Sequence, residues 1–206
     1  MSEAIADIEC DDVAVAEDEG ALKPSRRWRV LLFLLAFSPV IVLGIAVGTH
    51  AVDIPVWDDW ERGEMWHRYY EGTLDFEYMY SPHIEHRSLL PRLLTLVCGL
   101  LFDGDLRAEI WCIFLIVAGT TLFCFGLLRH TLGRESHAVW PTEFLVNLLI
   151  CCPVQYPDFL WASMVAFMMP FFCLAEILYL SVTRLPVWAK LLLIVGACEL
   201  GTHRFS

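Results

Sequence analysis

VLLFLLAFSPVIVLGIAVGTHAV, residues 30–52, is the stretch that decides the fold class of this chain. It is an apolar run of about 22 residues, and at ~1.5 Å per residue a helix of that length spans the ~30 Å hydrocarbon core of a bilayer. The whole chain of 206 residues is 57% hydrophobic and only 19% charged, and further apolar runs follow the first. These features predict an all-α fold, a polytopic bundle of transmembrane helices.

An acidic segment precedes this first span. Eight of the 25 Asp and Glu residues lie within the first 19 positions. We expect residues 1–27 to form a disordered cytoplasmic tail with a basic flank, because the segment is acidic and lacks aromatic residues until the span begins. Its length and charge argue against a cleaved signal peptide. The basic residues next to the span favour a cytoplasmic N-terminus; they are Lys23, Arg26, Arg27 and Arg29.

Four more apolar segments follow the first span, which we place at 28–51, so the sequence predicts about five spans. They are Glu109–Leu128, Val139–Gln155, Leu160–Val182 and Leu185–Leu200. The apolar segment 88–102 is short for a span and contains Pro91 and Arg92, so we expect an interfacial helix there. This arrangement places the basic connections on the cytoplasmic side. Residues 52–108 then form one large external loop with membrane-parallel helices, and residues 109–206 hold the further spans.

Charge and cysteine patterns exclude several classes of protein. The formal net charge is -11 and the sequence has no basic patch, so nucleic-acid binding is not predicted. The eight cysteines show neither metal-binding nor redox spacing, and all but Cys10 lie in apolar segments. We therefore expect them to be small buried hydrophobic residues rather than a disulfide framework.

The predicted external loop holds most of the side chains that are capable of chemistry. It begins near VWDDW, residues 56–60, where Asp58 and Asp59 lie between tryptophans, and SPHIEHRSLLP, residues 81–91, lies near its end. One interpretation is a solvated acidic rim within an aromatic belt. A metal site is a second interpretation, which we do not favour because the HxEH spacing matches no metalloprotease motif. The third is group transfer at the membrane surface, with a carboxylate as base and arginine binding a phosphate.

These features resemble the GT-C class of membrane glycosyltransferases, which share a basic N-terminus, a first span and an external loop that opens with a carboxylate pair. PRLLTLVCGLLFDGDLRAEIW, residues 91–111, is similar to the class pattern of Pro, an apolar helix, a short Gly turn and a span opening with Arg. HIEHRSLLPRLL, residues 83–94, and PVQYPDFLWAS, residues 153–163, look closer to a group of bacterial GT-C-like proteins. The resemblance covers about residues 25–206. Chains of the class normally continue for several more spans, so it implies the N-terminal portion of such an enzyme.

The resemblance implies transfer of a hexose or pentose from a polyprenyl-phosphate donor to an acceptor glycan, lipid or protein. The reaction would take place on the external face of a bacterial plasma membrane. A loop carboxylate near the first span is the general base of the class, and the matching positions are Asp58 and Asp59. No cofactor is expected beyond the lipid-linked donor, and a divalent metal is not favoured. The residues expected to bind substrate are His83, Glu85, His86, Arg87, Arg92 and Asp158.

Other interpretations stay open at this point. Asp158 would lie on the same side as Asp58 and could join the site, yet Asp at the start of a helix is also a common N-cap. A non-catalytic integral membrane protein, either a fragment or an assembly subunit, is the alternative class of function. A transporter is less favoured, because its polar residues would be expected in paired broken helices near the membrane midplane rather than in a loop.

Overall fold

The computed structural model describes residues 25–83, 86–87, 89–133 and 136–201. For Asp58, Glu61, residues 82–83, residues 86–87 and residues 197–201 it describes the backbone alone. The helices of the bundle are α1 (Arg26–His50), α5 (Leu106–Thr131), α6 (Val139–Ile150), α7 (Tyr156–Leu160), α8 (Val165–Val182) and α9 (Val187–Gly201). Two short 3₁₀ segments, η2 (Pro153–Gln155) and η3 (Ala162–Met164), flank α7.

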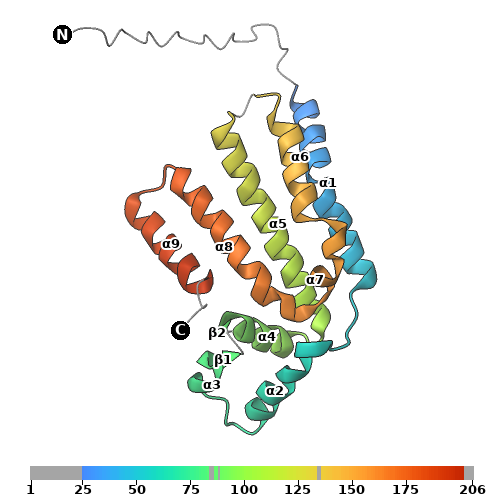
Figure 1. Ribbon diagram of the computed structural model, residues 1–206, viewed down its shortest axis with the longest axis vertical. Coiled ribbons are helices and arrows are strands. Elements are labelled where there is room, and N and C mark those ends of the chain that lie inside the picture. The colour runs from blue at the N-terminus through green and yellow to red at the C-terminus, as the bar shows by residue number, and fades with distance from the viewer. Residues whose placement is uncertain (1–24, 84–85, 88, 134–135, 202–206) are drawn as a thin grey trace, which may run out of the picture.

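The described residues between 52 and 105 form a separate layer, which we call the cap. It contains η1 (Trp57–Glu61), α2 (Arg62–Tyr70), α3 (Phe76–Tyr80), the two-residue strands β1 (Pro82–His83) and β2 (His86–Arg87), and α4 (Leu89–Leu101). Figure 1 shows the cap gathered at the end of the bundle opposite the start of α1, with α4 lying across that end. The predicted apolar helix at 88–102 is therefore a helix of the cap and does not run along the bundle.

Three helical segments in the described residues are long and apolar enough to cross a membrane. They are α1 with 25 residues, α5 with 26 residues, and Ala162–Val182, which joins η3 to α8. The predicted helical fold is therefore confirmed, with three helices that could cross a membrane by their length and composition. The other two predicted spans contain shorter helices, the 12-residue α6 and the 15-residue α9.

The predicted span Val139–Gln155 is a regular α-helix only as far as Ile150. The proline ring of Pro153 disfavours a helical conformation at the residue before it, and Cys152 accordingly has an extended ψ of 126°. The chain then continues through η2 into α7. A hydrophobicity pattern that runs unbroken through these residues therefore covers two helices with a bend between them.

The bundle is apolar outside and carries polar side chains inside, which is the pattern expected of helices that face lipid. On α6, Leu145, Leu148 and Leu149 are exposed, whereas Glu143 and Asn147 are completely buried. Asn147 donates a 2.9 Å hydrogen bond from Nδ2 to the carbonyl oxygen of Ala36 on α1. These buried polar contacts hold α6 against its neighbours, because an unpaired polar group in this interior is costly.

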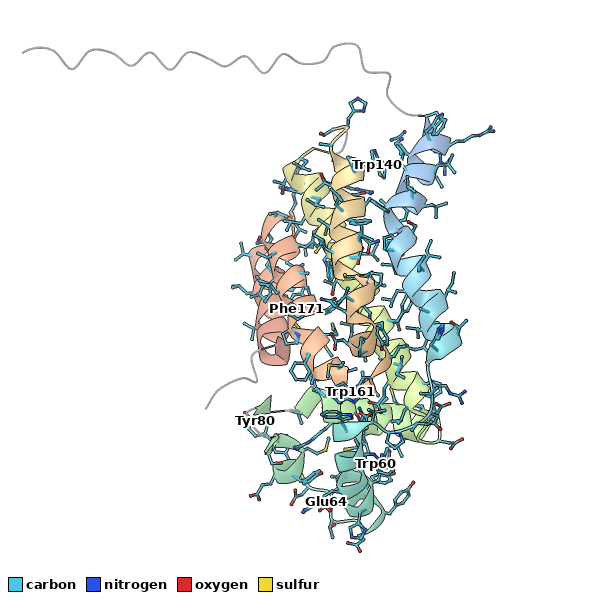
Figure 2. The ribbon with its side chains drawn as sticks, turned by 45° about the vertical axis from the view of Figure 1, so that its right-hand side comes forward. Trp60, Glu64, Tyr80, Trp140, Trp161 and Phe171 are labelled. Carbon is cyan, nitrogen blue, oxygen red and sulfur yellow. The ribbon has the colours of Figure 1, made fainter. Side chains whose placement is uncertain are left out.

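Glu143 receives the guanidinium of Arg129 from the last turn of α5. Nε and Nη2 of Arg129 donate to the two carboxylate oxygens over 2.5 and 2.9 Å. The same guanidinium lies over the rings of Phe33 and Trp140. Figure 2 shows Trp140 at the end of the bundle away from the cap. This two-pronged ion pair therefore ties α5 to α6 at the end where α1 begins.

α5 and α8 pack through glycines that accept aromatic rings. A Cβ added at Gly119 would lie 2.7 Å from the ring of Phe172, and one added at Gly126 would lie 2.4 Å from the ring of Tyr179. Phe123, between the two glycines on α5, contacts both rings with centroids 5.4 and 5.6 Å apart. The seven-residue spacing on each helix repeats the same contact two turns further along.

The turn between α4 and α5 sets how the cap joins the bundle. Asp103 and Gly104 both have positive φ, 54° and 80°, and Asp105 caps α5 by accepting from the Arg107 amide over 2.9 Å. The Arg107 guanidinium also hydrogen-bonds the Asp105 carboxylate and holds its pKa below the ordinary value. The two residues with positive φ and the helix cap at Asp105 together turn the chain sharply from α4 into α5.

Candidate functional site

The acidic pair of VWDDW lies in η1, which is anchored to the bundle by Trp161. The indole Nε1 of Trp161 donates a 3.0 Å hydrogen bond to the carbonyl oxygen of Val56, and its ring meets that of Trp57 edge to face. Trp57 has φ of 49°, a left-handed conformation that is uncommon for a bulky residue. Figure 2 shows Trp161 at the cap end of the bundle, on the side of the cap that carries Trp60. Contacts from a distant segment therefore hold η1 in a conformation that η1 would rarely adopt by itself.

Asp59 points into the protein rather than toward solvent. It is 4% exposed, and its Oδ2 accepts a 3.1 Å hydrogen bond from the backbone amide of Val56. Its Oδ1 lies 3.1 Å from Nη2 of Arg62 as an ion pair, although without the angle of a hydrogen bond. Asp59 thus binds the backbone amide at the start of η1 and pairs with Arg62, and both contacts are structural.

Arg62 connects this acid to a second buried carboxylate. Its Nη1 donates a 2.6 Å hydrogen bond to Oε1 of Glu109 in the first turn of α5. The other carboxylate oxygen of Glu109, Oε2, accepts from the hydroxyl of Thr95 on α4 over 2.9 Å. We call Asp59, Arg62, Thr95 and Glu109 the junction cluster. It joins η1, α2, α4 and α5 where the cap meets the bundle.

The structure separates the two acids that the sequence analysis treated as equivalent candidates for the base. Asp59 belongs to the junction cluster and its carboxylate is buried. Asp58 is the preceding residue of the same 3₁₀ helix, and its side chain lies outside the described part of the structure. A general base must reach an acceptor proton, directly or through one water. On this criterion the burial of its carboxylate argues against Asp59 as the base.

Arg92 was expected to bind substrate, and in the structure its guanidinium contacts groups of the cap. Nη1 of Arg92 donates to the carbonyl oxygens of Tyr78, Met79 and Ser81 and contacts the Ser81 hydroxyl, at distances between 2.5 and 3.3 Å. The guanidinium carbon also lies 4.9 Å from the centroid of the Tyr78 ring. Arg92 therefore binds the carbonyl groups at the C-terminal end of α3, where the amide and hydroxyl of Ser81 also donate to the Tyr78 carbonyl.

The other expected substrate-binding residues lie just beyond this arginine-bound helix end. β1 and β2 pair antiparallel, with Pro82 opposite Arg87 and His83 opposite His86. The backbone pairing thus brings both predicted histidines and Arg87 into one tight hairpin. Their side chains, and Glu85 entirely, lie outside the described residues.

Asp158 lies in the first turn of α7 and is partly buried. Trp161, which binds the carbonyl group of Val56, follows it by three residues. Residues of η1 and η3 are in contact, so the segment with Asp158 and the segment with the acid pair occupy the same end of the bundle. Among the residues that the structure describes, Asp158 forms no hydrogen bond or ion pair with the junction cluster.

Several features of this region were not predicted from the sequence. Arg62 and Glu109 were not singled out as partners, although a charged residue at the start of a buried helix is a signal that a counter-charge is needed. Within the described ranges, no group of three or more His, Cys, Asp or Glu residues is arranged to hold a metal ion. The guanidinium of Arg62 lies between the two carboxylates of the junction cluster and forms an ion pair with each.

Comparison of this chain with protein-family models, with curated proteins and with solved structures found no match. The candidate site is therefore interpreted from its own residues and geometry.

Proposed function

We propose that this chain is a membrane glycosyltransferase of GT-C type, or the N-terminal portion of one. It transfers a sugar from a polyprenyl-phosphate donor to an acceptor at the cap end of the bundle. The observation that carries the proposal is the anchoring of η1: Trp161 and the junction cluster hold the acid-bearing segment at one end of an apolar bundle. A base at that position lies where the lipid tail of a donor would leave the membrane and its sugar phosphate would meet water.

In the proposed reaction Asp58 accepts the proton of the acceptor hydroxyl group as its oxygen attacks the anomeric carbon. The bond from that carbon to the donor phosphate oxygen breaks, and polyprenyl phosphate leaves with the bonding electron pair. The anomeric centre inverts because attack and departure occur on opposite faces. Arg87, with His83 and His86 from the same hairpin, is suited to bind the donor phosphate by charge-assisted hydrogen bonds.

The proposed topology has about five spans, α1, α5, α6, α8 and α9, with the cap on the external face of a bacterial plasma membrane. Basic residues at the end of the bundle away from the cap support this orientation, since positive charge favours the cytoplasmic side. They begin α1 at Arg26, Arg27 and Arg29, end α5 at Arg129, and lie between α8 and α9 at Arg184. In this orientation α4 lies in the interface between membrane and water.

The alternative function is that of a non-catalytic membrane subunit, and an assay of sugar transfer distinguishes the two.

The test is sugar transfer in membranes that contain the chain in its full natural reading frame. Radiolabelled polyprenyl-phosphate hexoses and pentoses serve as donors, and label is followed into lipid, glycan and protein fractions. Asp58→Asn is expected to lower transfer by about 10²–10⁴-fold, the usual contribution of a general base. Glu64→Gln is the matched control, because Glu64 is an exposed cap carboxylate paired with Arg68.

Asp59→Asn separates the two acids. It is expected to lower the amount of folded protein while leaving most of the transfer per folded molecule, because Asp59 closes η1 rather than facing the acceptor. Full transfer by Asp58→Asn would remove the base assignment. Absence of transfer by the parent chain from every donor would overturn the enzyme proposal and favour the non-catalytic class.

A further inference from the structure

Two thiols lie side by side where α4 meets α5. Sγ of Cys98 is 3.8 Å from Sγ of Cys112, and Cys98 is 5% exposed. Cys98 follows Thr95 by three residues on α4, and Cys112 follows Glu109 by three residues on α5. The thiol pair therefore lies about one helical turn beyond the hydrogen bond between Thr95 and Glu109. The thiol pair is thus a second contact between the same two helices, next to the junction cluster.

The surrounding contacts keep these thiols close together. The sharp turn at Asp103 and Gly104 connects the two helices, and the Thr95 hydroxyl on α4 donates a hydrogen bond to Glu109 on α5. On the other side of α4, Trp66 packs so closely on Gly99 that an added Cβ would lie 2.1 Å from its ring. A disulfide has a sulfur–sulfur distance of about 2.0 Å, so the two atoms need to approach by about 1.8 Å, which side-chain rotation and a small helix adjustment supply.

We propose that Cys98 and Cys112 form a reversible disulfide that fastens α4 of the cap to α5 of the bundle. The proposal goes beyond the transfer reaction and does not depend on it. Its consequence is mechanical: α4 also carries Arg92, which holds the C-terminal end of α3, so the link fixes the cap to the bundle through one covalent bond.

The oxidant is a disulfide, either that of a thiol–disulfide oxidoreductase or oxidised glutathione. Cys112 is the more accessible thiol; as its thiolate it attacks one sulfur of the oxidant, and the other sulfur leaves as a thiolate. Cys98 then loses its proton and attacks Sγ of Cys112, which displaces the second thiolate. The two protons lost by the cysteines are taken up by the two departing thiolates, so two protein thiols are oxidised and one disulfide is reduced to two thiols.

The experiment uses the full chain in isolated membranes, treated with oxidised glutathione and then alkylated with N-ethylmaleimide. Trypsin cleaves after Arg107, so Cys98 and Cys112 fall in different peptides, 93–107 and 108–129. The second peptide also contains Cys124, so a Cys124→Ala chain makes the assignment unambiguous. A linked peptide pair that dithiothreitol separates is the expected result, with loss of both alkylated peptides.

Cys98→Ala and Cys112→Ala are each expected to abolish the linked pair, and Cys98→Ala is expected to leave Cys112 carrying glutathione. That variant shows that the oxidant reached the site. The proposal is overturned if the parent chain keeps both peptides alkylated, or if Cys112 carries glutathione while Cys98 stays free in the parent chain. The parent-chain measurement decides the question even where a variant fails to fold.

Discussion

Arg62 and Glu109 are 47 positions apart in the sequence, and Nη1 of the arginine lies 2.6 Å from Oε1 of the glutamate. The contact joins α2 of the cap to the first turn of α5. The Arg62 side chain is 14% exposed and also pairs with Asp59, so one arginine lies between two buried carboxylates. The junction cluster therefore links the cap to α5, and the position of η1 depends on it.

Replacing Arg62 by Met is expected to destabilise the protein strongly. The substitution leaves Asp59 and Glu109 buried without a counter-charge, and removing one partner of a buried pair typically costs about 3–5 kcal/mol. Thermal unfolding in detergent, followed by size-exclusion chromatography, measures the effect. Arg68→Met is the matched control on the same helix: its partner Glu64 is exposed, so little change is expected. Equal losses in the two variants would contradict a special role for the junction cluster.

Gly126→Ala is expected to loosen the contact between α5 and α8. The added Cβ would lie 2.4 Å from the Tyr179 ring, and overpacking of this kind costs about 1–3 kcal/mol. Gly196→Ala on α9 is the control, because a Cβ at that position would meet no described atom within 4 Å beyond its chain neighbours and the backbone of its own helix. There, replacement of a helical glycine is expected to be neutral or to stabilise by up to about 1 kcal/mol. The melting temperatures of the two variants in detergent should therefore move in different directions.

Arg92→Lys is expected to release the end of α3 without disturbing the bundle. A lysine lacks the planar guanidinium that stacks on Tyr78, and its shorter side chain does not reach the position from which Nη1 of Arg92 donates to the three carbonyl groups. Loss of a hydrogen bond from a charged donor, ~1.5 kcal/mol, should raise amide exchange at residues 78–83 about tenfold. Amides in the middle of α5 provide the internal reference. Unchanged exchange together with a higher KM for the lipid-linked donor would instead favour the substrate-binding role predicted from the sequence.

The thiol of Cys98 is expected to react slowly at neutral pH and faster as pH rises. Burial, with a smaller contribution from the neighbouring Cys112 thiol, raises the pKa of Cys98 to about 12. Glu109 also raises it, whereas Arg62 opposes the shift. Because the thiolate is the reactive form, alkylation should increase about tenfold per pH unit between about pH 7 and pH 10.

Site-resolved mass spectrometry of the reduced chain at a series of pH values measures this rate. An ordinary thiol with a pKa of about 8.5 would approach a plateau above about pH 9. A plateau of that kind at Cys98 would show that its environment does not suppress ionisation. Peptide 93–107 contains no other cysteine, so its alkylated fraction reports Cys98 alone.

Much of the helical structure is predictable because its determinants are local. The run 30–52 predicts α1, and the short apolar segment 88–102 is a separate helix, α4, which the structure places at Leu89–Leu101. The predicted segment Leu185–Leu200 covers α9, which runs from Val187 to Gly201, except for its last residue. The bend after Ile150 was missed, because the hydrophobicity pattern continues through Pro153 while the backbone does not.

The candidate site was predictable only in part. The sequence placed the acid pair and the histidines in one external loop, and the structure gathers their backbones into one cap. It did not indicate that Asp59 is buried against Arg62, since the partner Glu109 belongs to a helix that begins after the cap ends. Nor did it show that the guanidinium of Arg92 donates hydrogen bonds to three carbonyl groups of the cap, because the positions of backbone carbonyl groups at a helix end cannot be read from residue types.

By itself, therefore, the sequence determined that this protein is helical, where its apolar helices lie and which loop carries the reactive side chains. Those properties follow from hydrophobic runs, prolines and charges within a few residues of one another. Only the tertiary structure showed that Asp59 is buried, that Arg92 binds the end of α3 and that Cys98 and Cys112 meet. These outcomes depend on side chains that are far apart in the sequence, such as those of Arg62 and Glu109. The packing of the helices against one another brings them together.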